Sequence, residues 1–271
     1  MKSRPFRMEL FKLSRKPIAL LSVLVLLALC KAALLAVHAP ILPDEEGSAF
    51  AYLAQSASMT MVLWWFLLLC LAAASISNER SRGILRMHLS RPVGRGAFLF
   101  ARVGALLVVL ALLLAADAAV GVLLASLFRN FGDVADPALQ GPQFSASAMA
   151  FGILRCYLLT FLGLAAALAM GVLFSVLTAN PVTAIAWAAG TGLVTEGVRR
   201  VFEISMGAYV HYVPTQYIFI HFDQIKSLSH GFSIAVPGSS YLLLSIGIPL
   251  AYFLTFILVA HKVLQRADIG E

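Results

Sequence analysis

The chain has 271 residues, of which 61% are hydrophobic and only 12% are charged, and its mean hydropathy is +0.90. This composition has more apolar surface than one globular core can bury, so it excludes an ordinary water-soluble domain and indicates an integral membrane protein. The formal net charge of +7 follows membrane topology, because basic residues gather on one side of the predicted spans, and no nucleic-acid partner is expected.

The first segment, residues 1–17, is basic and precedes an apolar run. Phe6, Leu10 and Leu13 fall on one face of a helix, which predicts a short helix lying in the membrane interface. A basic segment that only fixes the orientation of the next span is the alternative. The run that follows is long for a signal peptide and contains Lys31, which argues against cleavage.

Six apolar stretches follow, each long enough to cross a bilayer, for which about 20 residues suffice. The longest uncharged stretch, Cys156 to Thr195, is divided at Asn180 and Pro181, because proline lacks an amide hydrogen and disfavours helix at the preceding residue. We therefore predict an all-α fold with one transmembrane domain over residues 1–271 and spans at about 18–37, 57–77, 103–128, 149–178, 183–200 and 239–260.

The basic residues orient these spans. With a cytoplasmic N-terminus, the inner segments hold 14 of the 20 Lys and Arg residues and the outer loops hold four. Basic residues concentrate on the cytoplasmic side of membrane proteins, so we expect both termini in the cytoplasm. The membrane is expected to be the bacterial plasma membrane. Three cysteines, Cys30, Cys70 and Cys156, lie in spans at unrelated spacings and are expected to be packing residues.

The loop at residues 78–97, between the second and third spans, is the most informative part of the sequence. From Ser81 to Leu89 it is compatible with a short helix, and Pro92 and Gly94 then turn the chain back to the membrane. Five arginines are more than a connector needs: Arg80, Arg82, Arg86, Arg91 and Arg95. An apolar and basic surface suits a cytoplasmic partner, and a simple topology anchor is the alternative.

This loop resembles the signature loop of type-2 ATP-binding cassette (ABC-2) exporter permeases. The similarity rests on Asn78-Glu79-Arg80, Ser81-Arg82-Gly83-Ile84-Leu85, Leu89-Ser90-Arg91-Pro92-Val93 and Arg95. The C-terminal Arg266-Ala267-Asp268-Ile269 is similar to the tail of many such permeases, although Ala267 stands where a second basic residue is common. The resemblance implies a coupling helix seated in a separate ATPase, with contacts from Glu79, Arg80, Gly83, Leu85, Pro92 and Arg95.

The resemblance also implies the partners. The chain contains no GxxxxGK[ST] motif and its cytoplasmic segments are too short for a nucleotide-binding domain. We therefore expect no enzyme activity, cofactor or metal on this chain, and ATP and Mg²⁺ on two copies of a partner ATPase. Six spans are half of the usual membrane assembly, so a second permease subunit is expected, a homodimer being favoured and a heterodimer possible.

Four charged residues fall within or at the ends of spans: Lys31, Asp117, Arg155 and Glu196. Unpaired charges are costly in a membrane, so these residues are candidates for a substrate pathway or for pairing between helices. Long side chains can also extend to the interface, which is the alternative for Lys31 and Arg155.

The outer loop at residues 201–238 is apolar and aromatic but too short to span twice. It resembles the outer re-entrant or interfacial helices of the same family. An interfacial belt is the alternative for its aromatic residues Tyr209, Tyr212, Tyr217, Phe219 and Phe222. Its three histidines, His211, His221 and His230, do not have the spacing of a zinc site.

The sequence thus predicts the permease subunit of an ATP-driven exporter. A membrane scaffold or sensor that transports nothing is the main alternative. An intramembrane enzyme is disfavoured because the chain has neither a GxSxG nor an HExxH motif.

Overall fold

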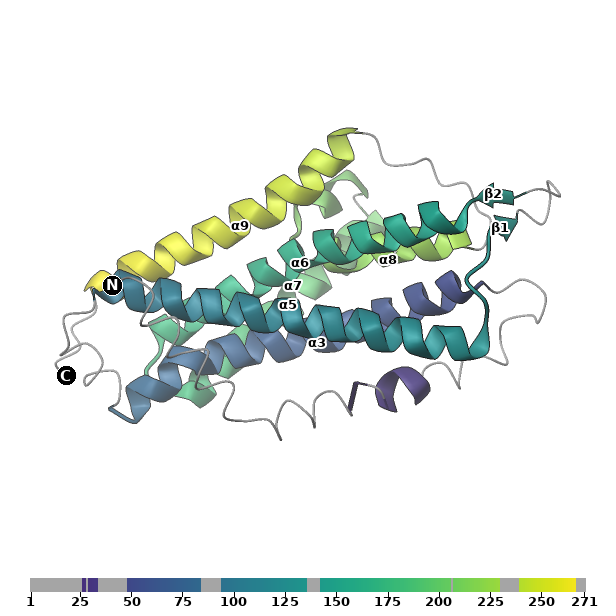
Figure 1. The fold of residues 1–271 in the computed structure, drawn as a ribbon. Helices are drawn as coiled ribbons and strands as arrows, with labels where there is room; N and C mark the ends of the chain where they lie inside the picture. The colour runs from purple at the N-terminus through teal and green to yellow at the C-terminus, as the bar shows by residue number, and fades with distance from the viewer. Residues whose placement is uncertain are drawn as a thin grey trace.

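The computed structural model describes residues 26–27, 29–33, 48–83, 94–135, 142–205, 207–229 and 239–266. Long helices packed side by side dominate this part of the chain (Figure 1): α3 (Ala49–Ser81), α5 (Arg95–Phe128), α6 (Ala146–Leu177), α7 (Pro181–Ser205) and α9 (Ser239–Arg266). Residues 26–27 and 29–33 are also helical. Shorter elements are η1 (Gly207–Tyr212), α8 (Gln216–Ser229) and an antiparallel pair of strands, β1 (Val134–Ala135) and β2 (Pro142–Phe144).

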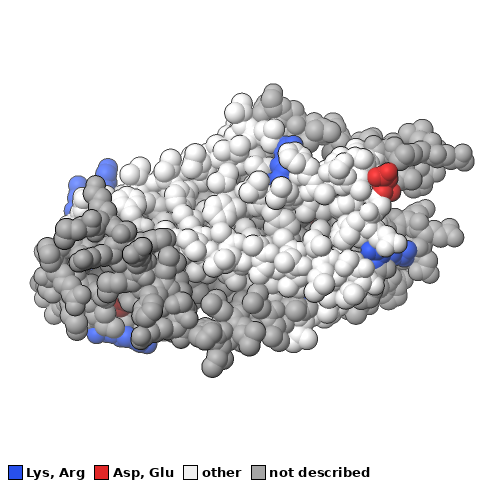
Figure 2. Space-filling model, in the orientation of Figure 1, with Lys and Arg blue, Asp and Glu red and all other residues white. Residues whose placement is uncertain are grey.

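Four of the described helices, α3, α5, α6 and α9, are long and apolar enough to cross a membrane. Figure 2 shows a broad uncharged surface along the bundle, with most charged groups near its two ends and one basic group between them. The chain is therefore a helical, multi-pass membrane protein, as the sequence predicts. The six-span arrangement stays a prediction, because α7 is not among these four helices and residues 18–37 lie mostly outside the described part.

The helices at the expected coupling loop run further than the sequence predicts. α3 continues to Ser81 and α5 begins at Arg95, so both ends of the 78–97 segment are helical. A short helix starting at Ser81 was expected, and this start is wrong: Ser81 ends α3, and Gly83 has a φ of +70°. Positive φ terminates helices and favours glycine. Residues 84–93, with Leu85 and Pro92, lie outside the described residues.

α6 and α7 are separate helices joined at Asn180 and Pro181. Asn180 Oδ1 accepts a hydrogen bond of 2.9 Å from the Val182 amide, so it satisfies a donor that the first turn of α7 leaves unpaired. Pro181 is the first residue of α7, where its missing amide hydrogen costs nothing.

The centre of the bundle is a close contact between α3 and α6. An added Cβ at Gly171 would lie 2.6 Å from the Leu69 carbonyl oxygen and 2.8 Å from Ala72 Cβ. One turn further, Ser175 Oγ accepts hydrogen bonds from the Ile76 amide at 2.8 Å and the Ser77 amide at 2.9 Å. Small residues let helix backbones approach, which is how membrane helices gain packing and polar contacts without a hydrophobic driving force.

η1 and α8 form a folded-back segment beside the N-terminal part of α6 and the C-terminal end of α7. η1 returns along α7, where the Phe202 and Tyr209 ring centroids are 6.3 Å apart. α8 then runs antiparallel to α6: Thr160 Oγ1 donates to the Ile218 carbonyl at 3.4 Å, and Cys156 Sγ donates to the His221 carbonyl at 3.2 Å. This segment therefore packs within the bundle.

The aromatic residues of this segment divide into two groups. Tyr209 and Tyr212 are exposed, as an interfacial belt requires, whereas Tyr217, Phe219 and Phe222 are buried in the bundle. An interfacial belt is thus a wrong interpretation for the three α8 aromatic residues.

The α3–α6 contact predicts the effect of two matched glycine substitutions. Gly171→Ala places a methyl group against the Leu69 carbonyl and is expected to lower stability by about 1–3 kcal/mol through overpacking. Gly190→Ala in α7 has no atom within 4 Å of the new Cβ and should be neutral or stabilising by up to about 1 kcal/mol, because alanine favours helix. Thermal unfolding of both variants in lipid nanodiscs checks this. Equal melting temperatures would contradict the close contact.

Candidate functional site

A buried carboxylate lies at the centre of the bundle. Asp117 of α5 is fully buried and accepts four hydrogen bonds. Its Oδ2 accepts from Lys31 Nζ at 2.9 Å and from Tyr157 Oη at 2.8 Å. Its Oδ1 accepts from Thr60 Oγ1 at 2.9 Å and from Trp64 Nε1 at 3.0 Å. The Asp117 network, as we call these five residues, joins α3, α5, α6 and the helical residues 29–33.

The pairing of Lys31 with Asp117 lowers the cost of burying two charges in an apolar interior. Burying an unpaired ion costs several kcal/mol, and pairing compensates only when the remaining polar atoms are also hydrogen-bonded. The Lys31 side chain is fully buried and 2.9 Å from Asp117, so the alternative in which Lys31 extends to the membrane interface is wrong. Both oxygens of Asp117 are occupied, which suits a contact that holds helices together.

Three members of the Asp117 network were not identified from the sequence. Thr60 and Trp64 are separated by four residues on α3 and therefore lie on one face, which was an available signal. Tyr157 gave no such signal, because a single tyrosine in a long apolar run is equally consistent with packing.

The other two charged candidates lie elsewhere. Arg155 of α6 is half-buried. Glu196 of α7 accepts two hydrogen bonds from Arg199, from Nη2 at 2.6 Å and from Nε at 2.8 Å. The structure therefore brings together Lys31 and Asp117, and it places Arg155 and Glu196 in different surroundings.

Arg199 connects α7 to α8. In addition to Glu196, its Nη1 contacts Glu203 Oε2 at 3.2 Å and Gln216 Oε1 at 3.1 Å. Its guanidinium carbon lies 5.4 Å from the centroid of the Phe219 ring, a distance at which an arginine is attracted to an aromatic face. Arg199 is only 6% exposed, and the sequence analysis did not single it out.

These charged residues border a cavity of about 430 Å³ between α3, α7 and α8. Its α3 wall is largely apolar, with Met59, Val62 and Trp65, and its α7 and α8 walls are polar, with Glu196, Arg199, Arg200, Glu203 and Asp223. A cavity with one apolar and one charged wall suits an amphipathic molecule better than a simple ion.

A second cluster holds the ends of α3 and α5 at the expected coupling loop. Glu79 Oε1 accepts a hydrogen bond of 2.8 Å from Arg102 Nη2, and the same nitrogen donates to the Ser75 carbonyl at 2.7 Å. Both side chains are mostly buried, at 13% and 15% exposed. Glu79, chosen from the sequence, therefore pairs with an arginine that the sequence did not single out.

The neighbouring arginines attach these ends to the rest of the bundle. Arg80 Nη1 lies 3.5 Å from the Val176 carbonyl of α6. Arg95 Nη1 donates to the Leu264 carbonyl at 3.3 Å and the Gln265 carbonyl at 2.9 Å. The Val176 carbonyl belongs to the last turn of α6, where no helical amide remains to pair with it, and Leu264 and Gln265 lie in the last described turn of α9. We call the contacts of Glu79, Arg80, Arg95 and Arg102 the helix-end junction.

The fold and its polar contacts define the class of protein as a multi-pass helical membrane protein with a cavity at one face of the bundle. Residues 6–195 match the family described as ABC-2 family transporter protein. The match covers more than half of the chain, which therefore belongs to this family of transporter membrane components. The comparison with curated proteins finds no match.

The Asp117 network predicts a double-mutant result. Asp117→Asn leaves the Lys31 ammonium buried without a countercharge and is expected to lower the free energy of unfolding by about 3–5 kcal/mol. Lys31→Met in the same chain removes the unpaired charge, so the double variant should recover most of the loss. Thermal unfolding of the two single variants and the double variant checks this. Additive losses in the double variant would show that the two side chains do not interact.

Proposed function

We propose that this chain is the permease subunit of an ATP-driven exporter and that residues 78–97 couple it to a separate ABC ATPase. The proposal rests on membership of the ABC-2 family and on the helix-end junction. The loop that would meet the ATPase connects two long helices, α3 and α5. The ends of these helices are held together by the Glu79–Arg102 ion pair. In this arrangement both termini are cytoplasmic and the membrane is the bacterial plasma membrane.

The junction gives the loop a direct mechanical connection to the membrane helices. A force on residues 84–93 would reach α3 through Ser81 and α5 through Arg95. Since Glu79 and Arg102 join these helices and Arg95 holds the end of α9, the three helix ends would move together. The Asp117 network joins α3 and α5 again at greater depth, so the pair would transmit motion along its length.

The substrate pathway is proposed to lie along the cavity between α3, α7 and α8. Exposed apolar side chains continue from this cavity over the neighbouring faces of α3 and α7, among them Leu63, Phe66, Leu193, Val194 and Val198. Contiguous apolar faces of this kind mark surfaces that meet lipid or another subunit. A second permease subunit, identical or related, would complete the pathway there, with the η1–α8 segment as its outer re-entrant cap.

The working assembly would contain two permease subunits and two ATPases. ATP and Mg²⁺ would bind to the ATPases. An apolar or amphipathic substrate fits the mixed walls of the cavity better than a small inorganic ion. A scaffold that binds the ATPase without transport is distinguished from a permease by whether hydrolysis and transport respond together to changes in the loop.

Two matched glycine variants test this proposal. Gly83 and Gly94 lie within the coupling loop, on either side of residues 84–93, and an added Cβ meets no atom within 4 Å at either position. Only Gly83 has a positive φ, of 70°, and a side chain there costs about 1–2 kcal/mol. Gly83→Ala should therefore weaken the ATPase complex by about tenfold, whereas Gly94→Ala should not.

The measurements are affinity for the copurified ATPase in nanodiscs and ATP-dependent transport in proteoliposomes. Both should fall together in Gly83→Ala and be unchanged in Gly94→Ala. Unchanged affinity in Gly83→Ala would contradict the coupling role of the loop, and lost affinity without any transport in the native chain would identify a scaffold.

A further inference from the structure

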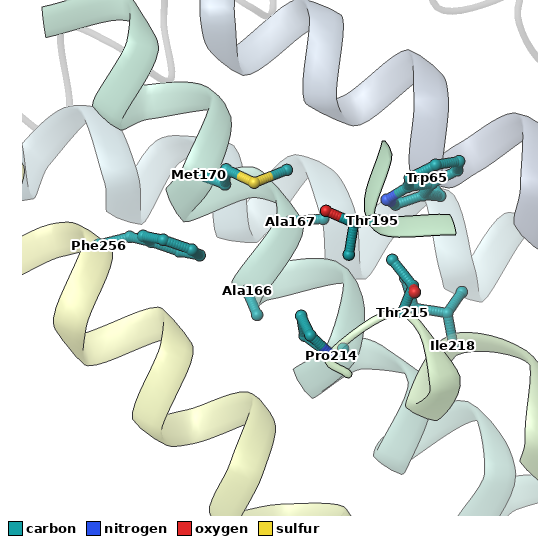
Figure 3. Close-up of a pocket in the computed structure, with 10 residues that line it drawn as sticks. Trp65, Ala166, Ala167, Met170, Thr195, Pro214, Thr215, Ile218 and Phe256 are labelled. Carbon is teal, nitrogen blue, oxygen red and sulfur yellow. The ribbon is translucent and has the colours of Figure 1, made fainter. Parts of the chain in front are cut away.

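A second, much smaller cavity lies deep in the bundle, where α3, α6, α7, α9 and the turn before α8 meet (Figure 3). Its volume is about 20 Å³, and a buried water needs about 10–15 Å³ measured in this way. The cavity thus has room for a single water molecule and for no larger ligand. Its walls include Gly163 and Ala166 of α6 and Phe256 of α9.

Two buried polar groups on its walls have no hydrogen-bond partner among the described residues: the indole nitrogen of Trp65 and the hydroxyl of Thr215. Each of these residues is only 3% exposed. Leaving a buried polar group unpaired costs about 1–3 kcal/mol, and native proteins satisfy nearly all such groups. Two orphaned groups on one small cavity therefore point to a shared partner.

A third polar group completes the set. Thr195 also lines the cavity, and its hydroxyl already donates to the Thr191 carbonyl at 2.8 Å. Its oxygen still has a lone pair that accepts a hydrogen bond. Figure 3 shows Trp65, Thr195 and Thr215 around the same space, from α3, α7 and the turn before α8. Together these three side chains offer one donor from Trp65, one acceptor from Thr195 and one hydroxyl, of Thr215, that can either donate or accept.

We infer that this cavity is a hydration site in which one ordered water bridges Trp65 Nε1, Thr195 Oγ1 and Thr215 Oγ1. The water accepts from the indole, donates to Thr195 and exchanges a hydrogen bond with Thr215. Three bonds is the usual number for a buried water. The three side chains do not satisfy one another directly, since neither the Trp65 indole nor the Thr215 hydroxyl has a hydrogen-bond partner among the described residues.

The hydration site lies next to the large polar cavity, from which its water would exchange. Trp65 lines both the 20 Å³ cavity and the 430 Å³ cavity, so the hydration site and the polar cavity share a wall residue. The preceding residue, Trp64, donates to Asp117. Two consecutive tryptophans of α3 therefore belong to two polar sites. Trp64 pairs with a protein carboxylate, and Trp65 pairs with the inferred water.

The site links the η1–α8 segment to α3 and α7 through a molecule that can exchange. The link is independent of the proposed transport function, because it rests on the cavity and its polar groups alone. Its tests accordingly use the purified full-length chain in nanodiscs and need neither ATPase nor substrate.

The first test is the hydrogen-bonding state of the Trp65 indole. Ultraviolet resonance Raman spectra of the native chain and of Trp65→Phe are subtracted, which isolates Trp65 from Trp64 and Trp187. We expect the difference spectrum to show a hydrogen-bonded indole. A free N–H signature would mean that the cavity is dry and would overturn the inference.

The second test uses the sign of a stability change. Thr215→Val replaces the hydroxyl with a methyl group of similar size. In a hydrated cavity the water loses one of its three partners, so the melting temperature should fall by about 2–4 °C, whereas Thr215→Ser should retain most of the native value. Thr255→Val, at an exposed position of α9, is the matched control and should change little. An increased melting temperature in Thr215→Val, expected when an orphaned hydroxyl is removed from a dry cavity, would overturn the inference.

Discussion

The bundle depends on one buried carboxylate. Asp117 accepts four hydrogen bonds from three other parts of the chain, and one of the four is the ion pair with Lys31. It lies in a position where neither water nor lipid could satisfy it. Membrane helices associate without a hydrophobic driving force, so polar contacts and close packing must specify which helices meet. The Asp117 network supplies the first of these and the Gly171 contact between α3 and α6 supplies the second. Together these two contacts specify which helices pack against each other. The helix-end junction then joins the same helices next to the expected coupling loop.

The positions of most helices could be predicted from the sequence because long apolar runs leave few alternatives in a membrane. Lys31 and Asp117 could be identified as exceptional because charges in such runs are expensive. Their partners could not, since residues 86 positions apart in the chain meet only after the helices pack. The same limit applies to Glu79, whose partner is Arg102. Arg199, at the end of a predicted span, was not singled out, because Gln216 and Phe219 of α8 contact it only after the chain folds back.

Three sets of polar contacts join helices at different positions in the described bundle, and we call them tiers. The helix-end junction ties α3, α5, α6 and α9 beside the coupling loop, the Asp117 network ties α3 and α5 at greater depth, and Arg199 ties α7 to α8 near the large cavity. α3 contributes to the first two tiers and forms a wall of the cavity. For a permease driven by a separate ATPase, such a helix is a suitable element to connect the loop with the pathway, because displacement of its end changes the cavity wall.

The central claim, that this family member works as the membrane half of an ATP-driven transporter, is tested most directly by purification from the native host. The tagged full-length chain is extracted in mild detergent, and mass spectrometry identifies the proteins that copurify and their stoichiometry. An ABC ATPase recovered in equal amount with the permease is the predicted result. Recovery of the chain alone, or with partners that contain no ATPase, would contradict it.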